Sequence, residues 1–234
     1  MYMTLGYHKV VDPYLLRRKK FASEINSPNL FDFIDHWPLY AGVQNISRYL
    51  YIYETLKTLK NIEGDIVELG SWKGANLLWM AKVQAFLGSN KKIHCFDSFQ
   101  GLTEFSVHDT SSHLIHKYQG DERVLRSVID LYEYNNLIQI HKGLIEDTVP
   151  AWSELKTDIS LIYFDADLYE AASVTLNYLT PHLLVGGIIL FDEYGSKDWP
   201  GETRAVDEFL KMNKGFDTFV PKGCVQPTLG IKKL

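Results

Sequence analysis

"LIYFDADLYE" (residues 161–170) joins a short apolar run to two acidic residues. The run of Leu, Ile, Tyr and Phe is typical of a buried strand, and it ends at Asp165, with Asp167 two positions later. "GGIILFDEYG" (residues 186–195) has the same form and runs into an aspartate and a glutamate. Two buried strands that end in this way indicate a sheet whose strand ends carry acidic groups.

Strands and helices alternate on both sides of these stretches. Predicted strands cover residues 65–70, 91–99, 136–143, 159–167 and 186–195, and predicted helices cover residues 74–88, 121–134, 146–156, 169–179 and 201–213. This alternation predicts an α/β fold with a doubly wound, mostly parallel, Rossmann-like sheet. Residues 216–221 and 228–234 are two further runs, and we expect them to pair as antiparallel strands at the C-terminal edge.

The length of 234 residues suits one domain preceded by a lead segment. Residues 1–43 have no clear apolar period, and we interpret them as an N-terminal lead segment and a candidate lid. Apolar residues recur at three- and four-residue steps from Ile46 to Leu59, which predicts a helix. We assign this helix to the main domain, residues 44–234.

Composition narrows the classes of partner. A net charge of -5 argues against a nucleic-acid partner, because such binders neutralise phosphates with basic residues. No apolar run is long enough to cross a bilayer and no signal peptide is visible, so we expect a cytoplasmic protein without a membrane partner. Cys95 and Cys224 are the only cysteines, so neither a disulfide framework nor a cysteine-rich zinc site is expected.

Acidic residues end four of the predicted strands: Glu68, Asp97, Asp165 and Asp192. In a doubly wound sheet, ligands bind beyond the C-terminal ends of the strands, where the strand order reverses. Four acids at one edge therefore predict a site there. The sequence has neither the H-E-x-x-H spacing of zinc peptidases nor the G-x-S-x-G turn of serine hydrolases.

The turn "ELGSWKGAN" (residues 68–76) indicates a nucleoside ligand. Gly70 and Gly74 would let the backbone approach a ligand closely, but their spacing matches neither the dinucleotide nor the phosphate-loop pattern. Asp97 can accept hydrogen bonds from both hydroxyls of a ribose. S-adenosylmethionine carries a ribose and a sulfonium cation and no phosphate, so it is the predicted cofactor. The alternative is that the two glycines only make a tight turn.

The other acids indicate a cation. We expect the fourth and fifth strands to be neighbours, so that Asp165, Asp192 and Glu193 converge, and clustered carboxylates repel one another unless a cation holds them. Oxygen ligands alone suit Mg²⁺ or Ca²⁺. Asp167, on the same side as Asp165 in an extended segment, would be left to accept a proton. The alternative is that Asp165 or Asp167 caps the following helix.

Five stretches together resemble the macrocin O-methyltransferase family, whose members are metal-dependent sugar O-methyltransferases that use S-adenosylmethionine. They are "GDIVELGSWKGAN", "FDSFQGL", "YFDADLYEAASVTLNYL", "GGIILFDEYG" and "GETRAVDEF", and the resemblance runs from about Arg48 to Phe209. It implies a class I methyltransferase fold. One departure is Glu193, where the family usually has aspartate.

The resemblance also implies roles for individual residues. Asp165, Asp192 and Glu193 would bind Mg²⁺, and Asp167 would be the general base. The predicted cofactor-binding residues are Glu68, Gly70, Ser71, Gly74, Asp97, Ser98 and Gly143.

Three functions remain open from the sequence. The first is methylation of a sugar hydroxyl in a small-molecule or glycan acceptor, by a protein that could form a homo-oligomer. The second is methylation of a non-sugar diol such as a catechol, and the third is a cofactor-binding protein without catalysis. Trp199 could stack on a sugar ring or pack in the core.

Overall fold

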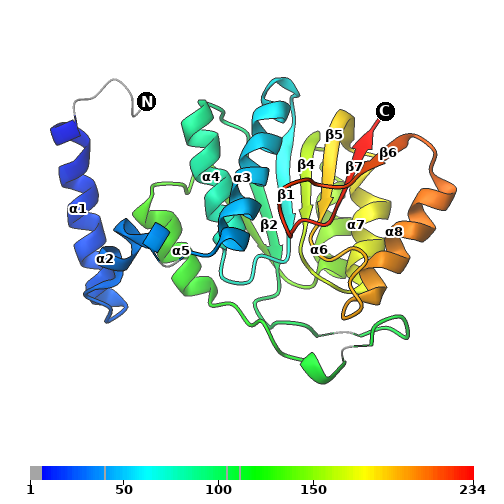
Figure 1. The fold of residues 1–234 in the computed structure, drawn as a ribbon, viewed down its shortest axis with the longest axis horizontal. Coiled ribbons are helices and arrows are strands. Elements are labelled where there is room, and N and C mark those ends of the chain that lie inside the picture. Colours follow the sequence, from blue (N-terminus) through cyan, green and yellow to red (C-terminus); the bar gives the residue numbers. More distant parts are fainter. Residues whose placement is uncertain (1–6, 40, 104, 111) are drawn as a thin grey trace.

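The computed structural model describes residues 7–39, 41–103, 105–110 and 112–234, and within them the strands form one seven-stranded sheet (Figure 1). The strand order is β3-β2-β1-β4-β5-β7-β6. The strands are β1 (Asp65–Leu69), β2 (Ile93–Asp97), β3 (Ile138–Lys142), β4 (Ile159–Phe164), β5 (Leu183–Phe191), β6 (Phe216–Phe219) and β7 (Leu229–Lys233).

Strands β1 to β5 are parallel, and β7 runs antiparallel to both of its neighbours. This arrangement confirms the predicted doubly wound, mostly parallel sheet with an antiparallel pair at the C-terminal edge. Strand β7 lies between β5 and β6, so that β6 is the outer strand of the pair.

Helices cover both faces of the sheet. The helices are α1 (Tyr7–Glu24), α2 (Leu30–Asp35), α3 (Val43–Thr58), α4 (Ala75–Leu87), α5 (Glu122–Leu131), α6 (Ile145–Ser153), α7 (Tyr169–Leu179) and α8 (Pro200–Met212). The apolar side chains of α3, α4 and α5 pack on one face, and those of α6, α7 and α8 pack on the other. None of the helices in the described ranges is both long and apolar enough to cross a membrane.

Strand β4 shows why its sequence has no polar alternation. Ile162 and Phe164 belong to the core under α6 to α8, whereas Leu161 and Tyr163 belong to the core under α3 to α5. Successive side chains of a strand point to opposite faces, and both faces of this strand are covered. Every residue of β4 is therefore buried.

The described part of the lead segment is helical, although its sequence shows no clear apolar period. Helix α1 lies beside α5 at one end of the molecule (Figure 1). Arg17 Nε donates a hydrogen bond to the Leu131 carbonyl at 3.0 Å, and the Tyr14 and Tyr132 rings lie 5.9 Å apart. The described residues that line the central cavity begin at Arg48, so a lid function for residues 1–43 stays a prediction.

The strand order reverses between β1 and β4, which are neighbours at the centre of the sheet. Strands β4 and β5 are also neighbours, as predicted. The C-terminal ends of β1, β2, β4 and β5 therefore meet at one edge, where a doubly wound sheet binds its ligands.

Candidate active site

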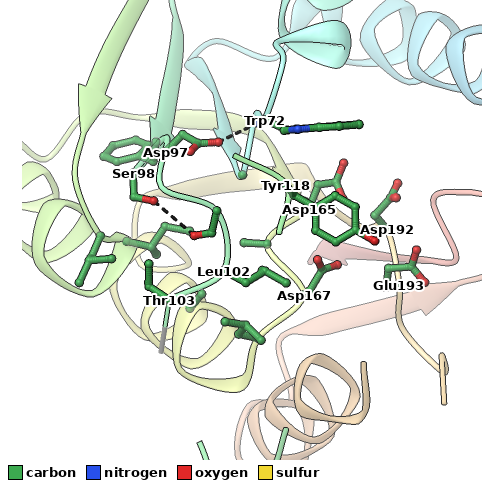
Figure 2. Close-up of a pocket in the computed structure, with 18 of the residues that line it drawn as sticks. Trp72, Asp97, Ser98, Leu102, Thr103, Tyr118, Asp165, Asp167, Asp192 and Glu193 are labelled. Carbon is green, nitrogen blue, oxygen red and sulfur yellow. Dashed lines mark hydrogen bonds between the residues drawn. The ribbon is translucent and has the colours of Figure 1, made fainter. Parts of the chain in front are cut away.

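A cavity of about 260 Å³ opens at this edge of the sheet. Eight of the predicted site residues line it: Gly70, Asp97, Ser98, Gly143, Asp165, Asp167, Asp192 and Glu193. Figure 2 shows Asp97 and Ser98 on one side and the other four labelled acids gathered on the opposite side. Three predicted residues, Glu68, Ser71 and Gly74, do not belong to the lining.

Gly70 follows β1 and lies against the backbone of Asp165, the residue that follows β4. Its φ is +81°, and a Cβ atom at this position would lie 2.1 Å from the carbonyl oxygen of Asp165. Its N–H donates to the Phe96 carbonyl at 2.9 Å. Gly74, also left-handed, is the N-cap residue of α4. Both glycines are needed for the turn itself, and Gly70 also lines the cavity.

Asp97 is held by three backbone N–H groups. Its Oδ2 accepts from Ser71 and Trp72 at 2.7 Å each, and its Oδ1 accepts from Phe99 at 2.6 Å. Burial raises the pKa of Asp97, and the three hydrogen bonds oppose that rise. A carboxylate has about four acceptor positions, so one remains on Oδ1.

Glu68 and Ser71 lie behind the cavity rather than in its wall. The Ser71 hydroxyl donates to Glu68 Oε2, and the Glu68 side chain is buried. Burial is the main cause that raises the pKa of Glu68 to about 8, and the Asp97 charge adds to it. Glu68 and Ser71 therefore stabilise the turn after β1 without contacting the cavity.

Asp165 and Asp192 lie together at the ends of β4 and β5. Asp192 accepts hydrogen bonds from the Tyr163 hydroxyl at 2.6 Å and from Arg48 Nη2 at 2.9 Å. Asn76 Nδ2 donates to Asp165 Oδ2 at 3.3 Å. Burial, then the charges of Asp192 and Asp167, raise the pKa of Asp165 well above its ordinary value.

Asp167 differs from the predicted geometry. The sequence predicted an extended segment here. The φ of Asp167 is instead +65°, because the chain turns at this residue to enter α7. Asp167 nevertheless lines the same cavity as Asp165. Burial, then the charges of Glu193 and Asp192, raise the pKa of Asp167 to about 7.

The alternative that Asp165 or Asp167 caps α7 is not supported. The N-cap residue is Leu168, which offers no side-chain hydrogen bond. The first backbone N–H of the helix, at Tyr169, instead donates to Asp109 Oδ1 at 3.1 Å. Asp109 comes from the long loop after β2, so neither acid of the "DAD" run is needed as a cap.

The family model described as Macrocin-O-methyltransferase (TylF) matches residues 41–219. The chain belongs to the macrocin O-methyltransferase family. The match spans the sheet edge with all of its acids, so the predicted resemblance is confirmed.

Two curated relatives and two solved structures are similar to this family member. A tetracenomycin-C derivative 4'-O-methyltransferase of Streptomyces olivaceus is 28% identical over 182 residues, 68% of this chain. The demethyldecarbamoylnovobiocin O-methyltransferase of Streptomyces niveus is 29% identical over 174 residues, 66% of this chain. The chain spans 64% of the length of each relative.

The solved structures agree in fold. The calicheamicin methyltransferase CalS11 superposes with a TM-score of 0.76 at 22% identity, over 98% of this chain and 94% of its own. The O-methyltransferase NovP superposes with a TM-score of 0.68 at 24% identity, over 80% of each chain. The class I methyltransferase fold is therefore shown.

The candidate site of this family member contains two residues that the sequence did not predict. Arg48 of α3 donates to Asp192 and also to the Gln226 side chain, and the Gln226 amide in turn donates to Glu193 Oε1. Both residues line the cavity. They lie 144 and 34 positions from Asp192 along the chain, and no local sequence pattern points to either.

Trp199 both packs and lines the cavity. It forms a small buried cluster with Leu102 and Leu168, against which Phe105 and Leu114 also pack. Trp199, Leu102 and Leu168 therefore give the cavity an apolar part of its wall.

The three proposed cation ligands have the oxygen atoms that a hard divalent cation prefers, but their side chains do not surround a common point. Asp165, Asp192 and Glu193 offer only oxygen atoms, which Mg²⁺ and Ca²⁺ prefer. Within the described ranges, however, no three Asp, Glu, His or Cys side chains stand close enough to hold a metal ion. Asp192 accepts hydrogen bonds from Tyr163 and Arg48, whereas Gln226 donates to the Glu193 carboxylate.

Proposed function

We propose that this chain is an S-adenosylmethionine-dependent O-methyltransferase that acts on a hydroxyl of a sugar or glycosylated metabolite. The observation that carries the proposal is one cavity that joins the turn after β1 to four acids and an apolar wall. Membership of the family supports the reaction, and the name of the Streptomyces olivaceus relative, which refers to a rhamnosyl compound, supports the acceptor class.

S-adenosylmethionine would occupy the part of the cavity lined by Gly70, Asp97, Ser98 and Gly143. Asp97 would accept a hydrogen bond from one ribose hydroxyl at the remaining acceptor position of Oδ1. Its other acceptor positions are taken by backbone N–H groups of Ser71, Trp72 and Phe99. Glu68, Ser71 and Gly74 would act indirectly, by shaping that turn.

The acceptor would lie against Trp199 with its reactive hydroxyl near the acids. Asp165, Asp192 and Glu193 would hold a divalent cation, which supplies positive charge that favours ionisation of a hydroxyl group. Asp167 would accept the hydroxyl proton, because it lines the cavity and has no capping contact to maintain. The oxygen would then attack the methyl group of S-adenosylmethionine in line with its bond to sulfur. That bond would break as the new one forms, and S-adenosylhomocysteine would leave with the electron pair.

A screen with an isotopically labelled methyl donor tests the proposal. Rhamnosides, other glycosides and a catechol would each be supplied with Mg²⁺ or with a chelator. We expect label transfer to a glycoside in the presence of Mg²⁺ only. Transfer to the catechol alone would favour a non-sugar diol as acceptor. Cofactor binding without transfer to any acceptor would favour a non-catalytic protein.

A further inference from the structure

Helix α8 holds the segment that follows β5. Glu202 Oε1 accepts a hydrogen bond from the backbone N–H of Glu193 at 3.1 Å. One residue later, the Thr203 hydroxyl accepts from the backbone N–H of Gly195 at 2.8 Å. The first turn of α8 therefore sets the path of the backbone that carries Glu193, a proposed cation ligand.

Glu202 is a costly residue for this task. Its side chain is 0% exposed, and its Oε2 has no hydrogen-bond partner within the part of the chain that the structure describes. A buried polar atom without a partner costs free energy of folding, and such atoms are rare in native proteins. Thr203 makes an equivalent hydrogen bond near the surface without that cost. Fastening the loop alone therefore does not explain a glutamate at position 202.

The surroundings of Glu202 connect it to the acids of the site. Burial, then the charges of Asp167 and Asp192, raise its pKa well above the ordinary value. Glu202 itself is not part of the cavity wall. Among the described residues, the hydrogen bond that joins Glu202 to the proposed cation ligands is the one to the backbone of Glu193.

We propose that Glu202 is a positioning residue that holds the backbone of Glu193, so that the Glu193 carboxylate enters the cavity beside Asp192. The inference rests on the proposed function, in which Glu193 helps to bind a cation. Gln226 holds the carboxylate end of the same side chain. Glutamate has one more rotatable bond than aspartate, and fixing its backbone restricts the directions that its longer arm can take.

Three variants separate positioning from packing. Glu202→Gln keeps the length and an acceptor oxygen, whereas Glu202→Met keeps the length and removes the acceptor. Thr203→Val is the matched control, since it removes the neighbouring hydrogen bond to Gly195 outside the cavity. Each variant would be measured for Mg²⁺ binding by calorimetry, for kcat and KM, for the Mg²⁺ concentration at half-maximal turnover, and for melting temperature.

We expect Glu202→Met to need about tenfold more Mg²⁺, because the loss of one hydrogen bond is worth about that factor. Its kcat should fall while the KM for S-adenosylmethionine stays unchanged. Its melting temperature should not fall, since a buried carboxyl group with an unpaired oxygen is removed. Glu202→Gln and Thr203→Val should bind Mg²⁺ like the wild type. Unchanged Mg²⁺ binding in Glu202→Met, or an equal defect in Glu202→Gln, would overturn the proposal.

Amide hydrogen exchange at Glu193 tests the inference without turnover or metal. The exchange should be about tenfold faster in Glu202→Met than in the wild type and in Glu202→Gln. Equal rates in all three proteins would show that Glu202 does not hold this backbone. A wild-type protein that neither binds Mg²⁺ nor transfers a methyl group would instead contradict the proposed function, and the exchange rates would still decide whether Glu202 positions Glu193.

Discussion

Asp167 adopts a left-handed backbone conformation, which few residues other than glycine, asparagine and aspartate tolerate. The conformation turns the chain into α7 while leaving the carboxylate in the cavity wall. Asparagine tolerates the same conformation and has nearly the same size. Replacing Asp167 by asparagine therefore changes its chemistry with little effect on its geometry.

If Asp167 is the general base, Asp167→Asn should lower the rate of methyl transfer by about a hundred- to ten-thousand-fold. Binding of S-adenosylmethionine and of Mg²⁺ should persist, and the melting temperature should change little. Single-turnover rates, calorimetry and thermal unfolding check these points. A fully active Asp167→Asn protein would refute the base assignment.

Asp165→Asn is the matched control for that prediction. Asp165 is a proposed cation ligand, so the variant should bind Mg²⁺ more weakly, and high Mg²⁺ should restore part of its activity. Turnover measured against Mg²⁺ concentration distinguishes the two defects. Identical Mg²⁺ dependence in the two variants would contradict their separate roles.

Gly70 lines the cavity, and the backbone around it also requires a glycine. Gly70→Ala would place a methyl group against the Asp165 backbone. It would also force an alanine into a left-handed conformation with a φ of +81°. We expect a loss of about 2–4 kcal/mol in the free energy of unfolding. Gly88 is the control, since it is also left-handed but has nothing within 4 Å of a built Cβ, so Gly88→Ala should cost only about 1 kcal/mol. Urea unfolding of both variants checks the difference, and equal losses would contradict it.

At the scale of elements, the long loop after β2 contacts the first residues of α7 and α8. Asp109 caps α7 through Tyr169 and lies against Gly201, at the start of α8. The His108 and Tyr169 rings pack at 4.4 Å. Other residues of this loop line the cavity, so its fastening sets the shape of the site.

Asp109→Ala should loosen that loop. We expect a loss of about 1 kcal/mol in the free energy of unfolding, as for a lost helix cap, together with a higher KM for the acceptor and faster proteolysis within the loop. Asp121→Ala is the control, because Asp121 caps α5 from its own N-cap position, at Arg123 and Val124, and is not part of the cavity lining. An equal rise in KM in both variants would contradict a specific role for the loop anchor.

At the scale of the whole molecule, the cavity has two ends with different chemistry. The end near Asp97 lacks the proposed cation ligands, which gather at the opposite end (Figure 2). Excess chelator should therefore abolish methyl transfer and leave the calorimetric affinity for S-adenosylmethionine unchanged, and added Mg²⁺ should restore turnover. Full activity in chelator would remove the cation from the proposed mechanism.

Much of the fold was predictable because its signals are local. Each strand of the parallel sheet is a short apolar run, and the runs alternate with helical patterns, so the sheet and the edge that carries the acids follow from the order of elements. Helix α1 was missed because its residues show no clear apolar period, and the structure places it beside α5 at the end of the molecule.

The sequence by itself determined the alternation of elements, the family and the acids at the ends of β1, β2, β4 and β5. Only the tertiary structure brought Arg48, Gln226 and Glu202 to those acids, and it assigned the capping of α7 to Asp109. The physical reason is distance along the chain. Strand and helix patterns depend on neighbours a few positions apart. The hydrogen bonds that Arg48, Gln226, Glu202 and Asp109 make join residues from 9 to 178 positions apart, and these contacts form only when the elements pack.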